Sequence, residues 1–400
     1  MLFAQHGFGK SNKIDRGLAS NHLSGIILSP KDETEQNMRN FVQTLQMTNP
    51  NIETLFDNQL YHVPFNNAND RNLPSYPYYP GHLSLSAFRG TGQLRKITSN
   101  VIDYQDSLGT SYITSPCILI SNFTDRETQI VLNLAQDSID YHRDNRIQNP
   151  LVISLLINEN AFLDTLQVNQ FLNEISVLDA TGFYITIARN SPAYNQIFDN
   201  KTVLTNILTS IYSLAEINEY KVIMGYSDFV GIPFLSVGAY AIGSGWHNGL
   251  RRFTVQQRIL PSSGGRQPRH RYSSWPLLNS ILMSELDTIS NSTTLLPQIL
   301  SGTSYDTRIL TASNPLSAPW DRDTGHMQHW EALCNGITHI VSPHNDISSK
   351  LDAMQQTIAN ALGLYSLLNA SYVPLEHSSQ PHHLTIWNDS INDFRKQANV

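Results

Sequence analysis

The stretches "LVISLLI" at residues 151–157 and "GFYITIA" at residues 182–188 decide the fold class. Both are apolar at almost every position, whereas a strand with one face in water alternates apolar and polar residues. Continuous apolar runs of this kind are typical of strands in a parallel sheet that is covered on both faces. The segment between them is predicted to be helical. The two stretches therefore predict an alternation of strand, helix and strand.

Similar runs recur through the first two-thirds of the chain. By the same criterion, further strands are expected at "GIILSP" (25–30), "TLFDNQ" (54–59), "CILISN" (117–122), "KVIMGY" (221–226) and "YAIGSG" (240–245). The segments between them have helical spacing; Met38, Phe41, Val42 and Leu45, for example, fall at i, i+3, i+4 and i+7. Each predicted strand is thus followed by a predicted helix.

A short eighth strand is expected at residues 271–274, before a helix over "PLLNSILMSELDTI". Alternation of this number favours an α/β fold of the (β/α)₈ TIM-barrel type. A doubly wound open sheet is the alternative, but no G-x-G-x-x-G motif opens a first helix. We expect an N-terminal arm over 1–24, the barrel over 25–291 with an insertion at about 62–116, and a helical C-terminal extension over 292–400.

The N-terminal stretch "AQHGFGKSN", residues 4–12, contains the Gly-Lys-Ser of a P-loop. The first glycine of that motif would fall at Ala4, and only three residues precede it, too few for a buried strand. We therefore exclude a nucleotide-hydrolase site. Lys10 and Lys13 are instead candidates for contacts with a nucleic-acid backbone, and the alternative is a solvated arm.

Composition indicates an ordered protein, since 40% of residues are apolar and 15% are charged. The two cysteines are too few for a disulfide framework or a cysteine-built zinc site. The chain has no long apolar run and no apolar leader. We expect a soluble cytoplasmic monomer without a membrane segment, a metal or a cofactor.

Charge is distributed unevenly along the chain. The net charge is −7, yet residues 229–284 contain no acidic side chain. Average composition would place about four or five carboxylates in such a window. Its cations are arginines, which suit bidentate phosphate contacts. The arginines that we expect to contact a nucleic-acid backbone are Arg251, Arg252, Arg266, Arg269 and Arg271.

In a barrel of this type the active site lies at the carboxyl ends of the strands. Asp57 follows the predicted strand at 54–59 and is the main catalytic candidate, although it could equally cap a helix. Glu159 and Asp228 are weaker catalytic candidates, with solvated or capping carboxylates as the alternative. The expected substrate-binding residues are Ser29, Lys31, Asn58, Gln59, Tyr61, Asn122, Asn158, Arg189, Tyr226, Trp246 and His247.

The stretch "GSGWHNGLRRF", residues 243–253, combines features that suit nucleic acid. Its glycines permit close backbone approach, and Trp246 and His247 provide flat surfaces for a base beside the Arg251-Arg252 pair. The alternative is a tight turn with Trp246 in the core. Histidines at "HMQH" (326–329) and 382–383 lack the partners that a metal site needs.

The sequence resembles the tRNA-guanine transglycosylase superfamily over about residues 25–253. Asp57 in "DNQLY" corresponds to the aspartate of the family's Asp-Ser-Gly-Gly-Phe-Gln motif, and "IMGYSDFVGIPFLSVGAYAIGSGWHNGLRRF" has the order and spacing of its late Met-Gly segment. The family's nucleophilic aspartate would fall near Gly243 or Ser244, and neither is acidic. The family's zinc-binding cluster is absent too.

These departures make the chain most similar to divergent, DNA-acting relatives of the superfamily that serve in bacterial anti-phage defence. The resemblance implies an N-glycosylase that flips a modified base, such as glucosylated hydroxymethylcytosine, out of phage DNA and leaves an abasic site. Asp57 would stabilise positive charge on the sugar and orient a water molecule. Two alternatives stay open, a tRNA-base transglycosylase and a non-catalytic nucleic-acid-binding barrel.

Overall fold

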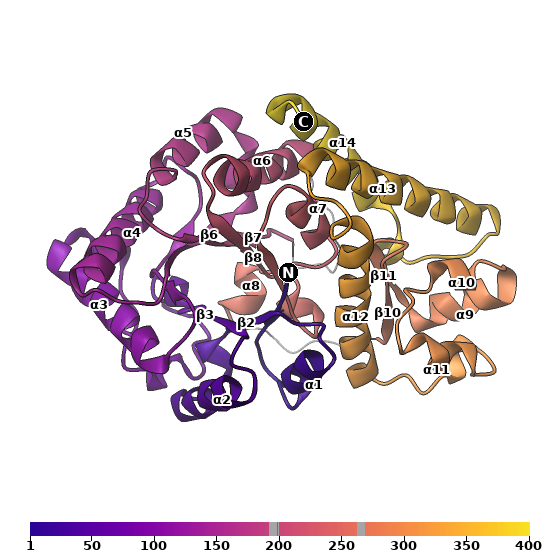
Figure 1. Cartoon of the computed structure of the whole chain (residues 1–400), viewed down its shortest axis with the longest axis horizontal. Helices are drawn as coiled ribbons and strands as arrows, with labels where there is room; N and C mark the ends of the chain where they lie inside the picture. Colours follow the sequence, from indigo (N-terminus) through magenta and orange to yellow (C-terminus); the bar gives the residue numbers. More distant parts are fainter. Residues whose placement is uncertain (192–197, 199, 262–268) are drawn as a thin grey trace.

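A parallel β-barrel surrounded by helices forms the centre of the molecule, which we describe from a computed structural model (Figure 1). The structure describes residues 1–191, 198, 200–261 and 269–400. The barrel strands in this part of the chain are β1 (Leu2–Gln5), β2 (Gly25–Leu28), β3 (Glu53–Phe56), β4 (Ile113–Thr114), β6 (Leu151–Asn158), β7 (Gly182–Ala188), β8 (Lys221–Gly225) and β9 (Ala241–Ser244).

The barrel is nearly closed, which confirms the predicted (β/α)₈ class. All barrel strands are parallel, in the order β3-β2-β1-β9-β8-β7-β6-β4. The two ends of this series meet through a parallel bridge between Leu55 of β3 and Tyr112, the residue before β4. An open doubly wound sheet would leave two free edges, so the alternative fold is excluded.

The barrel interior is filled in layers. One apolar cluster takes a residue from each strand or its border: Phe3, Ile27, Leu55, Tyr112, Val152, Tyr184, Ile223 and Ala241. Because side chains alternate along a strand, the residue two positions later in each strand also points inward. This next layer, toward the carboxyl ends, is polar and includes Gln5, Ser29, Asp57 and Thr186. The sequence thus places a layer of polar side chains inside the barrel at its carboxyl-terminal end, where the active sites of such barrels lie.

The predicted N-terminal arm is wrong, because Leu2–Gln5 is the first barrel strand. All four residues are buried, and β1 pairs with β2 on one side and β9 on the other. A strand flanked on both sides needs only a few residues to be buried, so the short run before Gly7 sufficed. The Gly-Lys-Ser stretch therefore does lie between a strand and a helix, α1 (Lys13–Ala19). The position of the first P-loop glycine is still occupied by Ala4, inside β1.

Two other strand predictions need correction. Residues 271–274 form β10 (Arg271–Ser274), which pairs antiparallel with β11 (Asn279–Leu282) outside the barrel, because β1 already occupies the remaining place. The expected helix over "PLLNSILMSELDTI" consequently begins only at Met283. At 117–122, only β5 (Leu119–Ile120) is a strand, and it pairs with β6 beside β4. Pro116, which cannot donate to a ladder, separates β4 from β5.

Helices cover the outside of the barrel, and the C-terminal part lies along one side of it (Figure 1). After α1, the helices of the barrel part are α2 (Glu35–Thr48), α3 (Thr91–Leu108), α4 (Arg126–Asp144), α5 (Thr165–Ile175), α6 (Lys201–Tyr212), α7 (Gly231–Ser236) and α8 (Val255–Arg258). The C-terminal helices are α9 (Met283–Ser292), α10 (Leu296–Ile299), α11 (Asp306–Leu310), α12 (Arg322–Ile340), α13 (Ile347–Ala370) and α14 (His382–Ala398). Helix α3 lies within the expected insertion at about 62–116, where it is the regular helix between β3 and β4.

Helix α12 joins the C-terminal part to the end of β9. His329 lies between Ser244 Oγ at 3.1 Å and Ser273 Oγ at 3.0 Å, and the indole of Trp330 donates to the carbonyl of Ser244 at 2.9 Å. Burial lowers the pKa of His329 well below its ordinary value, so the ring is neutral. The "HMQH" stretch thus has a docking role through His329.

Candidate active site

Asp57 occupies the carboxyl end of β3 and lies inside the barrel mouth. Its side chain accepts hydrogen bonds from Tyr61 Oη at 2.9 Å, Tyr184 Oη at 3.5 Å and the backbone nitrogen of Gln59 at 3.3 Å. The residue is 2% exposed. Burial raises the pKa of Asp57 from 3.8 to about 6, and the hydrogen bonds from Tyr61 and Gln59 only partly oppose this effect. A carboxyl group with such a pKa is half ionised at about pH 6 and mostly ionised at neutral pH, and it is suited to proton transfer.

The segment after Asp57 is fixed to the neighbouring strands. Asn58 donates to Thr114 Oγ1 of β4 at 3.1 Å, and Gln59 donates to Ser29 Oγ, just after β2, at 2.9 Å. Gln59 has a left-handed backbone, with φ of 56°, and so does Tyr226 after β8, with φ of 52°. Non-glycine residues avoid this region unless the surrounding structure imposes it, and such strain clusters at functional sites. The predicted substrate-binding residues Ser29, Asn58 and Gln59 therefore hold Asp57 in place.

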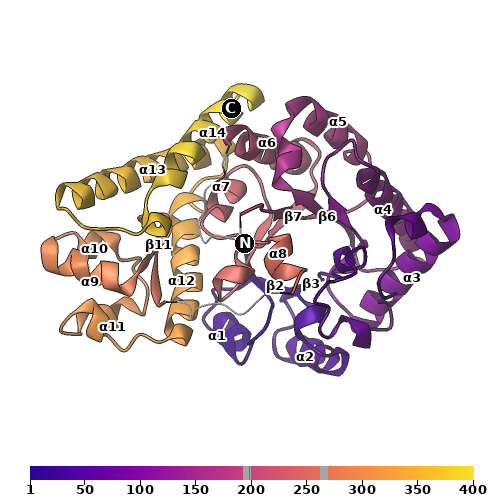
Figure 2. The same cartoon turned by 180° about the vertical axis from the view of Figure 1, so that it is seen from behind.

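Helix α8 covers the barrel mouth (Figure 2). Its last residue, Arg258, donates to Asp32 Oδ2 at 3.0 Å and to Tyr226 Oη at 3.2 Å. Phe253, just before α8, packs edge-on against Tyr61 and Tyr226. In this conformation a substrate that reaches Asp57 must displace these side chains.

The covering contacts are strongly electrostatic. Burial is the largest single effect and opposes ionisation of Asp32. The charge and hydrogen bond of Arg258, together with other nearby basic groups, outweigh it and lower the pKa of Asp32 to about 2. The guanidinium of Arg258 is buried, and its Nε has no hydrogen-bond partner in the described part of the chain. Arg258 therefore retains one N–H for a further acceptor near Asp57.

Lys31 binds helix α8 where that helix covers the barrel mouth. Its ammonium group donates to the carbonyl of Arg258, and its backbone nitrogen donates to Gln59 Oε1 at 2.9 Å. Burial and the neighbouring charge of Arg258 lower the pKa of Lys31 to about 7. Lys31 therefore lies at the barrel mouth, but its ammonium group contacts helix α8, which covers the mouth.

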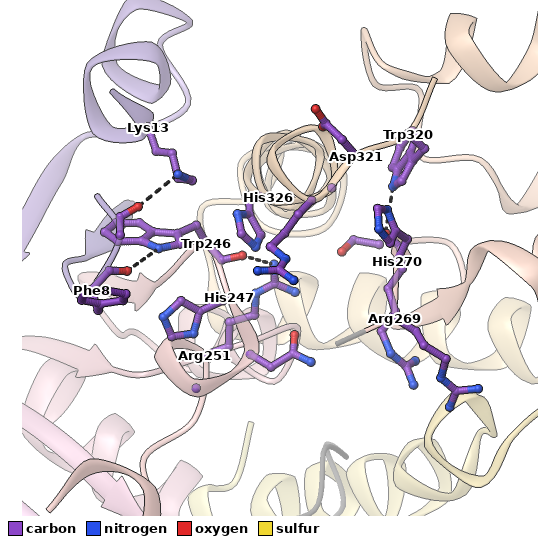
Figure 3. A pocket seen from close by; sticks show the side chains of 17 residues that line it. Phe8, Lys13, Trp246, His247, Arg251, Arg269, His270, Trp320, Asp321 and His326 are labelled. Carbon is purple, nitrogen blue, oxygen red and sulfur yellow. Dashed lines mark hydrogen bonds between the residues drawn. The ribbon is translucent and has the colours of Figure 1, made fainter. Parts of the chain in front are cut away.

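A cavity of about 450 Å³ opens beside the barrel mouth, between the loops after β1 and β9 and helix α12 (Figure 3). Trp246, His247 and Arg251 line it from the barrel, and His326 lines it from α12. Trp246 is 1% exposed, so the expectation of a free stacking surface is wrong for this residue and the alternative of a core tryptophan holds. Burial, reinforced by arginine charges, lowers the pKa of His247 to about 4 and of His326 to about 3. Both rings are neutral at pH 7 and can hydrogen-bond. Asp57 does not line this cavity.

Several arginines of residues 229–284, the stretch without acidic side chains, form hydrogen bonds or ion pairs that the sequence did not indicate. Arg251 donates to the carbonyls of Gly245 at 3.0 Å and Trp246 at 2.9 Å, and Arg269 forms a two-pronged ion pair with Glu376. Arg271 donates to the carbonyl of Ser280 at 2.7 Å. Arg252 lines a smaller cavity with Asp228 and Arg189, and Arg266 lies outside the described residues. The basic window is thus partly neutralised by acids distant in sequence.

Glu159 and Asp228, the weaker catalytic candidates, lie away from Asp57's hydrogen bonds. Glu159 forms a buried ion pair with Arg189, with 2.5 Å between Oε2 and Nε, and accepts from the backbone nitrogen of Asn190 at 2.6 Å. Asp228 accepts from the backbone nitrogen of Phe229 at 2.8 Å. The predicted substrate residue Arg189 is therefore held by the predicted catalytic residue Glu159.

The remaining predicted residues are placed at a distance from this network. Asn122 is exposed and bonds Asp125 Oδ2 at 3.0 Å, and Asn158 bonds Asn190 Oδ1 at 3.2 Å. Lys10 lies over the ring of Phe41 at 3.6 Å, and Lys13 lies 3.4 Å from Asp323. None of these side chains is hydrogen-bonded to Asp57 among the contacts of the described residues.

Sequence reasoning missed three important groups as site residues: Tyr184, Arg258 and Gln5. Tyr184 is the third residue of "GFYITIA", and an inward position with a hydroxyl inside an apolar strand was a usable signal. Gln5 Oε1 accepts from the backbone nitrogen of Tyr226 at 3.2 Å, but β1 itself was not recognised. Arg258 contacts Asp32 across 226 positions, for which no local pattern exists.

Taken together, these residues define a (β/α)₈ barrel with a buried carboxylate at the carboxyl ends of its strands and a basic, aromatic-lined cavity beside it. No protein-family model matches the chain, and no curated protein matches it. Within the described residues, no group of three or more His, Cys, Asp or Glu side chains could hold a metal ion. No helix in this part of the chain is long and apolar enough to cross a membrane.

Proposed function

We propose that this protein is a DNA N-glycosylase that removes a modified base and leaves an abasic site, with Asp57 as its catalytic carboxylate. The observation that carries the proposal is the environment of Asp57: a buried carboxyl group with a pKa of about 6, held by two phenolic hydroxyls at the active-site end of a barrel. The resemblance of "DNQLY" to the transglycosylase motif adds the reaction type.

The chemistry proceeds by hydrolysis. As the bond between C1′ and the base nitrogen breaks, its electron pair leaves with the base, and positive charge develops on the sugar. Ionised Asp57 stabilises that charge and orients a water molecule, which adds its oxygen to C1′ and gives a proton to the carboxylate. Asp57 then passes this proton to the departing base, which leaves as a neutral molecule. The free N–H of Arg258 is suited to a sugar or base oxygen at this point.

The cavity beside the mouth suits the rest of a nucleic acid. Trp246 and Arg251 are buried, but Phe8 and Arg269 are exposed at its edge. Exposed rings and guanidinium groups bind bases by stacking and phosphates by charge. A flipped nucleotide must also displace Phe253 and Arg258, so we expect DNA binding to break the contacts of Arg258 with Asp32 and Tyr226. Modified cytosine in phage DNA is the substrate class that the resemblance suggests, and a role in anti-phage defence follows from it.

The test is incubation with duplex DNA that contains cytosine, hydroxymethylcytosine or glucosylated hydroxymethylcytosine, followed by mass spectrometry of released bases and alkaline cleavage of the strand. We expect release of a modified base by the wild-type protein and none by Asp57→Asn. Asp179→Asn is the matched control, since Asp179 is exposed and precedes β7, at the opposite end of the barrel.

Other results would point elsewhere. Incorporation of labelled free base into tRNA would instead favour a transglycosylase. Salt-dependent DNA binding without release of any base would favour the non-catalytic barrel.

A further inference from the structure

Phe8 exposes its ring at the rim of the candidate site. Of the fifteen phenylalanines, all within the described residues, Phe8 alone is largely exposed, at 68%. It lies in the loop between β1 and α1, at the same end of the barrel as Asp57, and it lines the edge of the large cavity (Figure 3). Most of this ring lies in water at the rim of the site, where it is available to a bound ligand.

The loop holds the Phe8 backbone firmly while the ring points outward. Trp246 Nε1 donates to the carbonyl of Phe8 at 3.1 Å, and Lys13 Nζ donates to the carbonyl of Gly9 at 3.0 Å. A Cβ at Gly7 would lie 2.4 Å from the side chain of Leu250, and Gly9 has φ of +75°, so both flanking glycines are needed by the loop. The ring is therefore presented by a built turn, which reduces the entropy that a contact would cost.

One basic side chain lies against the exposed ring, and two more belong to the same part of the chain, each of the three within 4 Å of a carboxylate. The guanidinium of Arg71 lies 5.2 Å from the ring centroid, and the ammonium groups of Lys10 and Lys13 belong to the same loop region. Arg71 is held in turn by Asp32, at 3.0 Å. An apolar ring flanked by cations suits a polyanion with stacked aromatic groups, which is the chemistry of duplex DNA.

We propose that Phe8 is a wedge that enters the base stack of duplex DNA at the place vacated by the flipped nucleotide. The proposal rests on the proposed function, and it makes Phe8 a positioning residue rather than a catalytic one. Flipping removes the stacking of one nucleotide, and an aromatic ring in the gap replaces part of it. The wedge and the barrel mouth lie at one end of the molecule, so the flipped nucleotide would be directed toward Asp57.

The test compares duplex with single-stranded substrate, because a wedge is useful only where a stack must be opened. In Phe8→Ala, we expect base release from duplex DNA to fall about 5- to 150-fold, the range for loss of one base–aromatic stack, with single-stranded DNA cleaved at the wild-type rate. Phe8→Trp should retain activity on the duplex. Met47→Ala is the matched control, since Met47 is 77% exposed near the end of α2, at the opposite end of the barrel.

Fluorescence of 2-aminopurine placed beside the target base provides an independent measurement. We expect an increase on binding of wild-type protein and Phe8→Trp, and little increase with Phe8→Ala. Equal losses on single and double strands, or no loss on either, would overturn the wedge. Should wild-type protein release no base, the proposed function fails, and the fluorescence alone decides: an increase that depends on Phe8 supports the wedge, and no increase overturns it.

Discussion

Replacing Asp57 by asparagine is expected to stabilise the fold at neutral pH while it removes the carboxylate on which the proposed chemistry depends. Burial raises the pKa of Asp57 from 3.8 to about 6, so the folded protein binds this proton more tightly than the unfolded chain does. Stability contributed by this group is therefore present at low pH and is lost as the pH rises toward the folded-state pKa. Above that pH the ionised carboxylate destabilises the fold.

The magnitude follows from the two pKa values. The difference between 3.8 and about 6 corresponds to about 3 kcal/mol of unfolding free energy, at about 1.4 kcal/mol for each tenfold change in proton affinity. Asparagine is neutral at every pH and retains an acceptor for the backbone nitrogen of Gln59. The hydroxyls of Tyr61 and Tyr184 can rotate to pair with its amide. The stability gained by Asp57→Asn should therefore grow from near zero at about pH 4 to about 3 kcal/mol at about pH 8.

Urea denaturation of both proteins across this pH range measures the difference directly, and the other titrating groups cancel because the two chains share them. A constant difference for Asp57→Asn, or a variant that is less stable than the wild type at about pH 8, would refute the reasoning. A constant difference would mean that folding does not shift the pKa of Asp57, whereas a less stable variant at about pH 8 would mean that the site favours its ionised form.

Three other outcomes are expected. Asp32→Asn should remove about 2 kcal/mol of stability that the wild type has near neutrality and loses as the pH falls from 3.8 toward about 2, which denaturation in acid will show. Glu159→Gln should destabilise the fold by about 3–5 kcal/mol in urea titrations, because it removes the negative charge from a buried ion pair with Arg189. Lys13→Gln should weaken DNA binding and lower the salt dependence of the binding constant by about one phosphate contact, whereas an unchanged salt slope would remove Lys13 from the interface.

The fold class could be predicted because buried parallel strands have a clear signature. "LVISLLI" and "GFYITIA" coincide almost residue for residue with β6 and β7. Leu2–Gln5 was missed because its burial comes from pairing with β2 and β9, which four residues of local sequence do not reveal. Without Leu2–Gln5 only seven barrel strands are found, and this is why residues 271–274 were wrongly assigned as the eighth.

The candidate site was partly predictable for the same reason. Asp57, Gln59 and Tyr226 follow strands, and parallel strands bring their carboxyl ends together. Arg258 and its contact with Asp32 depend on how a loop far along the chain folds back over the mouth. The charge balance of residues 229–284 could not be predicted either, since Glu376 reaches Arg269 from the C-terminal part of the chain.

The central claim is that ionised Asp57 breaks an N-glycosidic bond in modified DNA, and the single-turnover rate of base release as a function of pH tests it most directly. We predict a rate that rises about tenfold per pH unit below about pH 6 and is constant above it, with no release by Asp57→Asn. A wild-type rate that does not change between about pH 5 and about pH 8, or base release by Asp57→Asn at the wild-type rate, would contradict the account.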